Sequence, residues 1–265
     1  MRIILFIALC VASVAAAPRT THQRIVGGDV TTIDQYPSIV ALLFVYEWVI
    51  YAQECAGAIL KQPICAHRST LHLVSYYQTN NFDAVSKWRV RAGSTFANAD
   101  GMIHRVSGNI IHPLYAVEPT MDHDIAVLRV DTSFEFNEFT QPAHIAGPNY
   151  RVPDYDDLWA AGWGTTYYGA PTGSAQLRHV QVLKINLDRC KQQYGVVHMV
   201  ITDSMLCSGW LTGGRDQCQG DSGGPIYHNG VVVGVCSFGI ECGRADFPGV
   251  NTRVANYTDW VVDNA

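Results

Sequence analysis

Short apolar stretches separated by turn residues recur from Ile25 onward, and this spacing restricts the fold more than any other feature. Three such stretches are Trp88–Ala92, Val180–Leu183 and Val231–Val235. Turn-forming residues stand between stretches of this kind, as at His228–Gly230. Short runs with this punctuation are typical of the strands of a sandwich or barrel. We therefore expect an all-β domain.

Helical spacing is confined to the C-terminal end, where Val254, Tyr257 and Val261, with Val262 as a further candidate, would share one face of a helix. The apolar run Ile39–Ile50 is too short to span a membrane and is interrupted by Glu47, so we interpret it as a buried strand pair. The composition is globular, with 48% hydrophobic and 15% charged residues. A net charge of −5 does not favour a nucleic-acid partner.

The N-terminal segment has the pattern of a signal peptide. Arg2 supplies the charge, Ile3–Val11 the apolar run and Ala15–Ala17 the small residues of a cleavage region. We expect residues 1–17 to be removed and the mature protein to be secreted, without a membrane anchor.

The stretch Gly220–Pro225, with the sequence Gly-Asp-Ser-Gly-Gly-Pro, indicates the chemistry. So many glycines are costly inside a helix or strand, but they allow a tight loop that brings backbone N–H groups close to a reacting atom. Ser222 stands at the centre of this loop, and Asp221 precedes it. The stretch therefore predicts a nucleophilic serine beside an oxyanion hole rather than an ordinary glycine-rich turn.

Together with Arg24–Gly28 (Arg-Ile-Val-Gly-Gly) and Asp122–Ala126 (Asp-His-Asp-Ile-Ala), this stretch resembles the chymotrypsin-like serine peptidases, and most closely the digestive trypsins of moths. The resemblance runs from Ile25 to Ala265. It implies two six-stranded antiparallel barrels packed together, with a C-terminal α-helix and the active site in the cleft between the barrels.

The resemblance also assigns roles to residues in the motifs. Ser222 would be the nucleophile, Asp124 the acid that orients the catalytic imidazole, and Gly220 a backbone donor to the oxyanion. Asp216 would lie at the base of the specificity pocket and select Arg or Lys side chains by a charge-assisted contact. The remaining pocket positions implied by the family are Ser237, Phe238, Gly239 and Gly249.

Residues 18–24 resemble an activation peptide that ends in Arg24. In the family, cleavage after this arginine frees an α-amino group, here that of Ile25, which inserts and pairs with Asp221. A buried carboxylate needs such a partner, and the uncleaved chain lacks the charge. The resemblance therefore implies a zymogen and an activating protease as a partner.

The chain keeps seven cysteines once Cys10 leaves with the signal peptide, and a secreted protein uses most cysteines in disulfides. The family pattern implies two bridges, Cys190–Cys207 and Cys218–Cys242. Cys236 lies in an apolar stretch and is interpreted as a buried free thiol. The partner of Cys55 stays open, because Cys65 is near it but no spacing requires the pair.

The catalytic histidine is the one part of the family pattern that is missing. The family places it in an Ala-Ala-His-Cys run, fifteen residues after the cysteine that matches Cys55, and Thr70 occupies that place. His67 and His72 are the nearest histidines. We expect Lys61–Phe82 to be irregular, with no histidine ring placed between Asp124 and Ser222.

Our hypothesis for this break is a reading-frame shift over roughly this segment, restored before Asp83. Possible codons for Lys61–His72, read from the second base, permit Asn-Asn-Arg-Ser-Val-Leu-Thr-Ala-Ala-His-Cys-Thr. This run restores the family motif, with His in place of Thr70 and Cys in place of Leu71. The hypothesis leaves open whether the shift is in the gene itself or in the reading of its sequence.

These observations predict a secreted, trypsin-type serine endopeptidase that is made as a zymogen. It would act as a monomer on polypeptides with Arg or Lys, in the gut lumen by resemblance, without cofactor or metal. No Cys/His cluster has metal-ligand spacing. The alternative is a catalytically silent homologue that keeps the pocket but cannot cut.

Overall fold

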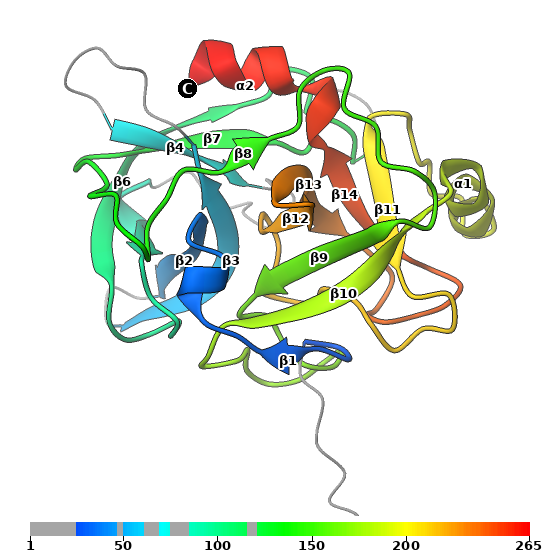
Figure 1. Ribbon diagram of the computed structural model, residues 1–265, viewed down its shortest axis with the longest axis horizontal. Helices are drawn as coiled ribbons and strands as arrows, with labels where there is room; N and C mark the ends of the chain where they lie inside the picture. Colours follow the sequence, from blue (N-terminus) through cyan, green and yellow to red (C-terminus); the bar gives the residue numbers. More distant parts are fainter. Residues whose placement is uncertain (1–24, 47–49, 61–68, 75–84, 116–120) are drawn as a thin grey trace, which may run out of the picture.

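The computed structural model describes residues 25–46, 50–60, 69–74, 85–115 and 121–265, with the backbone alone for residues 46 and 69–74. The expected signal peptide, the activation peptide, Cys65 and His67 lie outside the described residues. The described chain forms two β-sheets, each closed into a barrel, that pack against each other (Figure 1).

The first system is a closed antiparallel barrel in the order β2-β3-β4-β7-β6-β5. Its strands are β2 (Ile39–Tyr46), β3 (Ile50–Ile59), β4 (Ser69–Val74), β5 (Trp88–Ala92), β6 (Met102–Ile111) and β7 (Ala126–Val130). The pairing of β2 with β3 confirms the buried strand pair expected from the apolar run. Inward side chains from its strands, including Val40, Leu42 and Leu128, form the barrel's own core.

The second system is an eight-stranded sheet. Its strands are β1 (Asp29–Val30), β8 (His144–Ile145), β9 (Asp157–Gly162), β10 (Arg178–Ile185), β11 (Met205–Gly209), β12 (Pro225–His228), β13 (Val231–Phe238) and β14 (Gly249–Arg253). Strands β9, β10, β11, β14, β13 and β12 pair in a closed cycle, with β1 and β8 added at the side. This cycle confirms the expected second six-stranded barrel.

Short helices complete the described chain. They are η1 (Ile33–Gln35), η2 (Val85–Lys87), α1 (Leu187–Gly195), η3 (Val254–Asn256) and α2 (Thr258–Asn264). The C-terminal helix confirms the expectation, and Val254, Tyr257 and Val261 are buried against the core. The placement of Val262 on this face was wrong, because its side chain is exposed. None of the helices in the described residues has the length and apolar character that crossing a membrane requires.

The prediction that the chain is helical only at its C-terminal end was wrong, because α1 is a second α-helix. The Asn186 side chain accepts a hydrogen bond from the Arg189 N–H at 3.0 Å and so caps the first turn. Cys190 and Tyr194, four residues apart, are the buried positions of α1. Two buried positions in a short polar segment give a weak periodic signal, so tertiary packing decides its helical state.

The expectation that Lys61–Phe82 is irregular was wrong for Ser69–Val74, which form strand β4. This strand pairs with β7 from Ser69 to Val74 and with β3 at Leu73 and His72. Partners on both sides complete the barrel and supply the backbone hydrogen bonds that fix these residues as a strand. Residues 61–68 and 75–84 lie outside the described part.

The interface between the barrels positions the candidate site. A single core cluster contains residues of both barrels, such as Ile39 and Val127 from the first and Leu158 and Val180 from the second. Asp124 lies just before β7 of the first barrel, and Ser222 lies just before β12 of the second. Both motifs are therefore presented at strand ends beside this shared core.

Candidate active site

The loop that carries Ser222 is held in a conformation that glycine permits. Gly220 has φ +92° and Gly223 has φ +78°, a region that residues with a Cβ enter only with strain. The Gly224 N–H donates to the Asp221 carbonyl at 2.8 Å and closes a turn around Ser222. Ser222 is buried.

The first barrel holds this loop through β3. The Ala56 N–H donates to the Ser222 carbonyl at 2.9 Å, and the Gln53 side chain donates to the Gly220 carbonyl at 2.7 Å. Among the described residues, neither the Gly220 N–H nor the Ser222 N–H donates a hydrogen bond. Two N–H groups next to one serine hydroxyl are thus available to a ligand oxygen.

Asp124 is fully buried and is held from the second barrel. The Ser237 hydroxyl donates to the Asp124 carboxylate at 2.5 Å, and the Thr252 hydroxyl donates to the Asp124 carbonyl oxygen at 2.6 Å. Ser237 lies on β13 and Thr252 on β14, so two neighbouring strands fix the position of this carboxylate. Sequence reasoning missed both contacts, because they join residues more than one hundred positions apart.

Asp221 is buried next to Ser222, and its carboxylate accepts hydrogen bonds from the Gly164 N–H at 2.7 Å and the Cys218 N–H at 2.9 Å. Gly162 and Gly164 leave the room that it fills, since a Cβ at Gly164 would lie 2.5 Å from the carboxylate. Burial raises the pKa of Asp221 to about 6, although the two backbone hydrogen bonds lower it. Desolvation of the charge therefore outweighs its hydrogen bonds.

Asp216 is buried at the base of a cavity. Its carboxylate accepts from the Gly243 N–H at 3.0 Å and the Gln217 N–H at 2.9 Å. Burial raises the pKa of Asp216 to about 7 against these hydrogen bonds, and the charge of Asp221 raises it further. Gly249 has no room for a side chain, because a Cβ there would lie 2.7 Å from the Asp216 carboxylate.

The cavity extends from Asp216 to Ser222 and has a volume of about 60 Å³. Its walls include Ser237, Phe238 and Gly239 at the end of β13, all of which the resemblance had placed there. The geometry thus connects a buried carboxylate, a serine and a strand end in one concave site, as expected of a binding pocket.

The segment that begins at Ile25 packs beside this site. Ile25 is fully buried, and the Asp216 N–H donates to the Val26 carbonyl at 3.1 Å. Gly27 has φ +73° and lies so close to Gly214 that a Cβ would clash with its backbone. The Ile-Val-Gly-Gly sequence therefore fits a tight channel next to the loop of Asp216.

Comparison with known proteins agrees with the family resemblance of the sequence motifs. A family model described as Trypsin matches residues 25–261. The chain belongs to the trypsin family. It is 51% identical to "Trypsin, alkaline C" of Manduca sexta and 51% identical to "Trypsin CFT-1" of Choristoneura fumiferana, over the full length of both chains in each case. It is 34% identical to "Vitellin-degrading protease" of Bombyx mori, over 91% of this chain and 85% of that protein.

The two disulfides implied by the trypsin pattern are present. Cys190–Cys207 ties α1 to β11, and Cys218–Cys242 joins two loops that line the pocket. Cys236 is a buried free thiol, as expected. Cys55 is likewise a buried free thiol, and burial raises its pKa to about 12, so it is unreactive at neutral pH.

The histidine of the trypsin pattern falls in the segment that is described only in part. His67 lies outside the described residues, and Thr70 and His72 lie on β4, where only the backbone is described. The backbone of His72 pairs with Leu128 of β7. The expectation that no histidine ring lies between Asp124 and Ser222 concerns side chains outside the described part and stays a prediction.

Gln217 is a pocket residue that sequence reasoning missed. Its side-chain N–H donates to Asn251 at 2.9 Å, while its Oε1 is buried and has no hydrogen-bond partner among the described residues. Gln217 lines the cavity beside Asp216. Its place next to Asp216 in the sequence was the available signal, since neighbours in sequence share one loop. Among the described residues, no three His, Cys, Asp or Glu side chains are grouped to hold a metal ion.

Proposed function

We propose that this protein is a secreted serine endopeptidase of trypsin type, made as a zymogen, that cleaves polypeptides after Arg or Lys. The observation that carries this proposal is the cavity in which buried Asp216 faces the loop of Ser222. A long cationic side chain would place its charge at Asp216 and its carbonyl carbon beside Ser222. Digestion in a gut lumen is the setting that the resemblance to digestive trypsins of moths implies.

Two buried carboxylates support the zymogen and the specificity together. Asp216 and Asp221 accept only backbone N–H groups among the described residues, and burial raises the pKa of both. A buried carboxylate in this state gains from a cation, because opposite charge offsets desolvation. For Asp221 that cation is the α-ammonium of Ile25, freed by cleavage after Arg24, and for Asp216 it is the substrate's side chain.

The chemistry follows from the loop of Ser222. The Ser222 hydroxyl attacks the backbone carbonyl carbon of the Arg or Lys residue, and as the C=O π bond opens the carbonyl oxygen becomes an oxyanion. The N–H groups of Gly220 and Ser222 donate to this oxygen, where their effect is greatest because charge develops there. Asp124, fixed by Ser237 and Thr252, orients the imidazole that takes the serine proton.

The source of the imidazole divides the proposal into two cases. If the frame is restored, a histidine stands in place of Thr70. If the sequence is used as written, His67 or His72 must come within hydrogen-bond reach of both Ser222 and Asp124. The relatives, which are named as trypsins or proteases, give no support to a catalytically silent homologue.

The test compares two proteins, each cleaved after Arg24. One has the sequence as written, and the other has the frame-restored run in place of Lys61–His72. We expect the restored protein to hydrolyse a small arginyl amide and a lysyl amide, but not a phenylalanyl amide. Ser222→Ala in the restored protein is the matched control and must abolish turnover.

Each outcome has a defined meaning. Loss of the histidine costs about a millionfold in turnover in subtilisin, so activity of the chain as written shows that His67 or His72 serves. Activity of the restored protein alone locates the defect in Lys61–His72. Inactivity of both proteins, with the pocket still binding an arginine analogue, would refute the proposed peptidase function.

A further inference from the structure

A second cavity lies in the second barrel, away from Ser222. It has a volume of about 150 Å³, and Ile185, Leu206 and Val233 are among the apolar residues that line it. Strand β14 connects the two cavities, because Gly249 at its start borders the specificity pocket and Arg253 at its end lines this one. With a rise of about 3.3 Å per residue, the two ends are about 13 Å apart.

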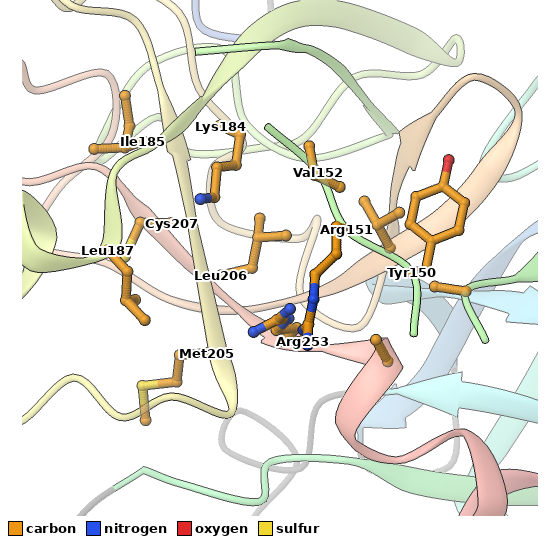
Figure 2. Close-up of a pocket in the computed structure, with 13 residues that line it drawn as sticks. Tyr150, Arg151, Val152, Lys184, Ile185, Leu187, Met205, Leu206, Cys207 and Arg253 are labelled. Atoms are coloured by element: carbon orange, nitrogen blue, oxygen red, sulfur yellow. The ribbon is translucent and has the colours of Figure 1, made fainter. Parts of the chain in front are cut away.

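Three cationic side chains surround this cavity (Figure 2): Arg151, Lys184 and Arg253. Lys184 already forms an ion pair with Asp154. Arg151 and Arg253 differ from it, because the side chain of neither makes a hydrogen bond or ion pair within the described residues. Figure 2 shows the Arg151 side chain running toward Arg253 at the cavity.

The positive charges of the two arginines repel each other in this cavity. Burial lowers the pKa of Arg253, and the nearby charge of Arg151 lowers it further, against the opposing effect of Asp203. Asp203 is itself paired with Lys191 at 2.6 Å. Two guanidinium groups therefore line one cavity, and within the described residues no carboxylate bridges them.

We propose that this cavity binds a small organic anion, an aromatic carboxylate whose ring enters the apolar hollow and whose charge bridges Arg151 and Arg253. Guanidinium groups bind carboxylates through paired hydrogen bonds, and they keep their charge at any working pH. A dry cavity of about 150 Å³ in another protein accommodates a benzene ring, so the hollow has the matching size. Charge and volume together therefore favour a benzoate-sized ligand.

The specificity pocket does not compete for this ligand. Its base is the carboxylate of Asp216, which repels an anion, whereas the second cavity has an excess of positive charge. The proposed peptidase function and the anion site therefore stand on different residues. Either can fail while the other holds.

The experiment measures benzoate binding to the full-length chain by calorimetry and by thermal shift, with neutral benzamide as the matched ligand. We expect one benzoate per chain, a rise in the melting temperature with benzoate concentration, and no comparable effect of benzamide. Raised salt should weaken the binding, because it screens the two arginines.

The variants are Arg253→Gln and Arg151→Gln, each expected to weaken benzoate binding at least tenfold. Arg105→Gln, at an exposed position of β6 in the first barrel, is the control and should leave the affinity unchanged. Arg151 is exposed, so its variant tests the site even if Arg253→Gln does not fold. Equal binding of benzamide, or undiminished benzoate binding in Arg151→Gln, would overturn the proposal.

Discussion

The buried side-chain oxygen of Gln217 leads to a specific prediction about the specificity pocket. Gln217 lines the cavity beside Asp216, and its buried Oε1 has no hydrogen-bond partner among the described residues. A buried acceptor without a partner costs about 1 to 3 kcal/mol. A cationic ligand on Asp216 would supply the missing donor, so we predict that Gln217 contributes to binding of Arg and Lys side chains.

The perturbation is Gln217→Met, which keeps the length of the side chain and removes the amide. A hydrogen bond to a charged group contributes about 1.5 to 3 kcal/mol. At about 1.4 kcal/mol for each factor of ten, the variant should bind benzamidine about 10- to 100-fold more weakly. Benzamidine carries an amidinium that stands in for a guanidinium, and its binding does not require the catalytic histidine.

The stability of the variant separates this role from a structural one. The substitution removes the costly buried oxygen, but it also removes the hydrogen bond to Asn251. These effects are of similar size and opposite sign, so the unfolding free energy should change by less than about 1.5 kcal/mol. Urea unfolding at one pH measures this change.

The control is Gln219→Met, because the Gln219 side-chain oxygen already accepts from the Thr165 hydroxyl at 3.0 Å. It lines the same cavity, so its substitution tests general disturbance of the loop. Benzamidine affinity should change less than threefold in this control. An unchanged affinity in Gln217→Met, or equal losses in both variants, would refute the role of Gln217.

Three further predictions concern the same pocket. Gly249→Ala should weaken benzamidine binding at least tenfold, because the new Cβ would lie 2.7 Å from the Asp216 carboxylate. An unchanged affinity would show that the residues around Asp216 shift to accommodate the Cβ. The pKa of Asp216 is raised to about 7, and benzamidine needs the ionised carboxylate. Benzamidine should therefore bind about tenfold more weakly for each pH unit below about 7, and Asp216→Asn should remove this pH dependence. Replacing Cys218 and Cys242 together by Ala should lower the unfolding free energy by about 3 kcal/mol, measured by urea unfolding, since the bridge closes a loop across 24 positions. A loss below about 1 kcal/mol would contradict this account of the bridge.

The sequence predicted those parts of the site that depend on local backbone demands. The glycines around Ser222 have positive φ angles that a chain of ordinary residues avoids, so their cluster reveals a functional loop. The turn at Asn229 and Gly230 also has two positive φ angles, which explains its position between β12 and β13. Such features can be predicted from the sequence, because the residues that require the conformation are close together in the chain.

The parts that were missed depend on contacts between distant residues. Strand β4 has no alternating pattern and exists because β3 and β7 supply partners on both sides. The hydrogen bond from Ser237 to Asp124 joins the two barrels and has no local signal. The unpartnered oxygen of Gln217 depends on the direction in which Asn251 holds its amide, which only the packed structure shows.

The proposed activation and the proposed specificity would depend on one set of contacts in the second barrel. The Asp216 N–H bonds to the Val26 carbonyl, so the segment that begins at Ile25 directly holds the residue at the base of the pocket. Asp221, the proposed partner of the freed Ile25 α-amine, is also close enough to Asp216 to raise its pKa. An ammonium beside Asp221 would therefore favour the ionised form of Asp216 and strengthen the binding of a cationic side chain.

The place of the missing histidine makes this coupling testable without catalysis. Thr70 lies on β4 of the first barrel, whereas Asp216, Gln217 and Gly249 belong to the second. A change confined to Lys61–His72 therefore removes the proton acceptor and leaves the recognition of Arg and Lys in place. The chain as written should thus bind benzamidine more tightly after cleavage at Arg24 than before it, and equal affinities would show that activation and specificity are not coupled.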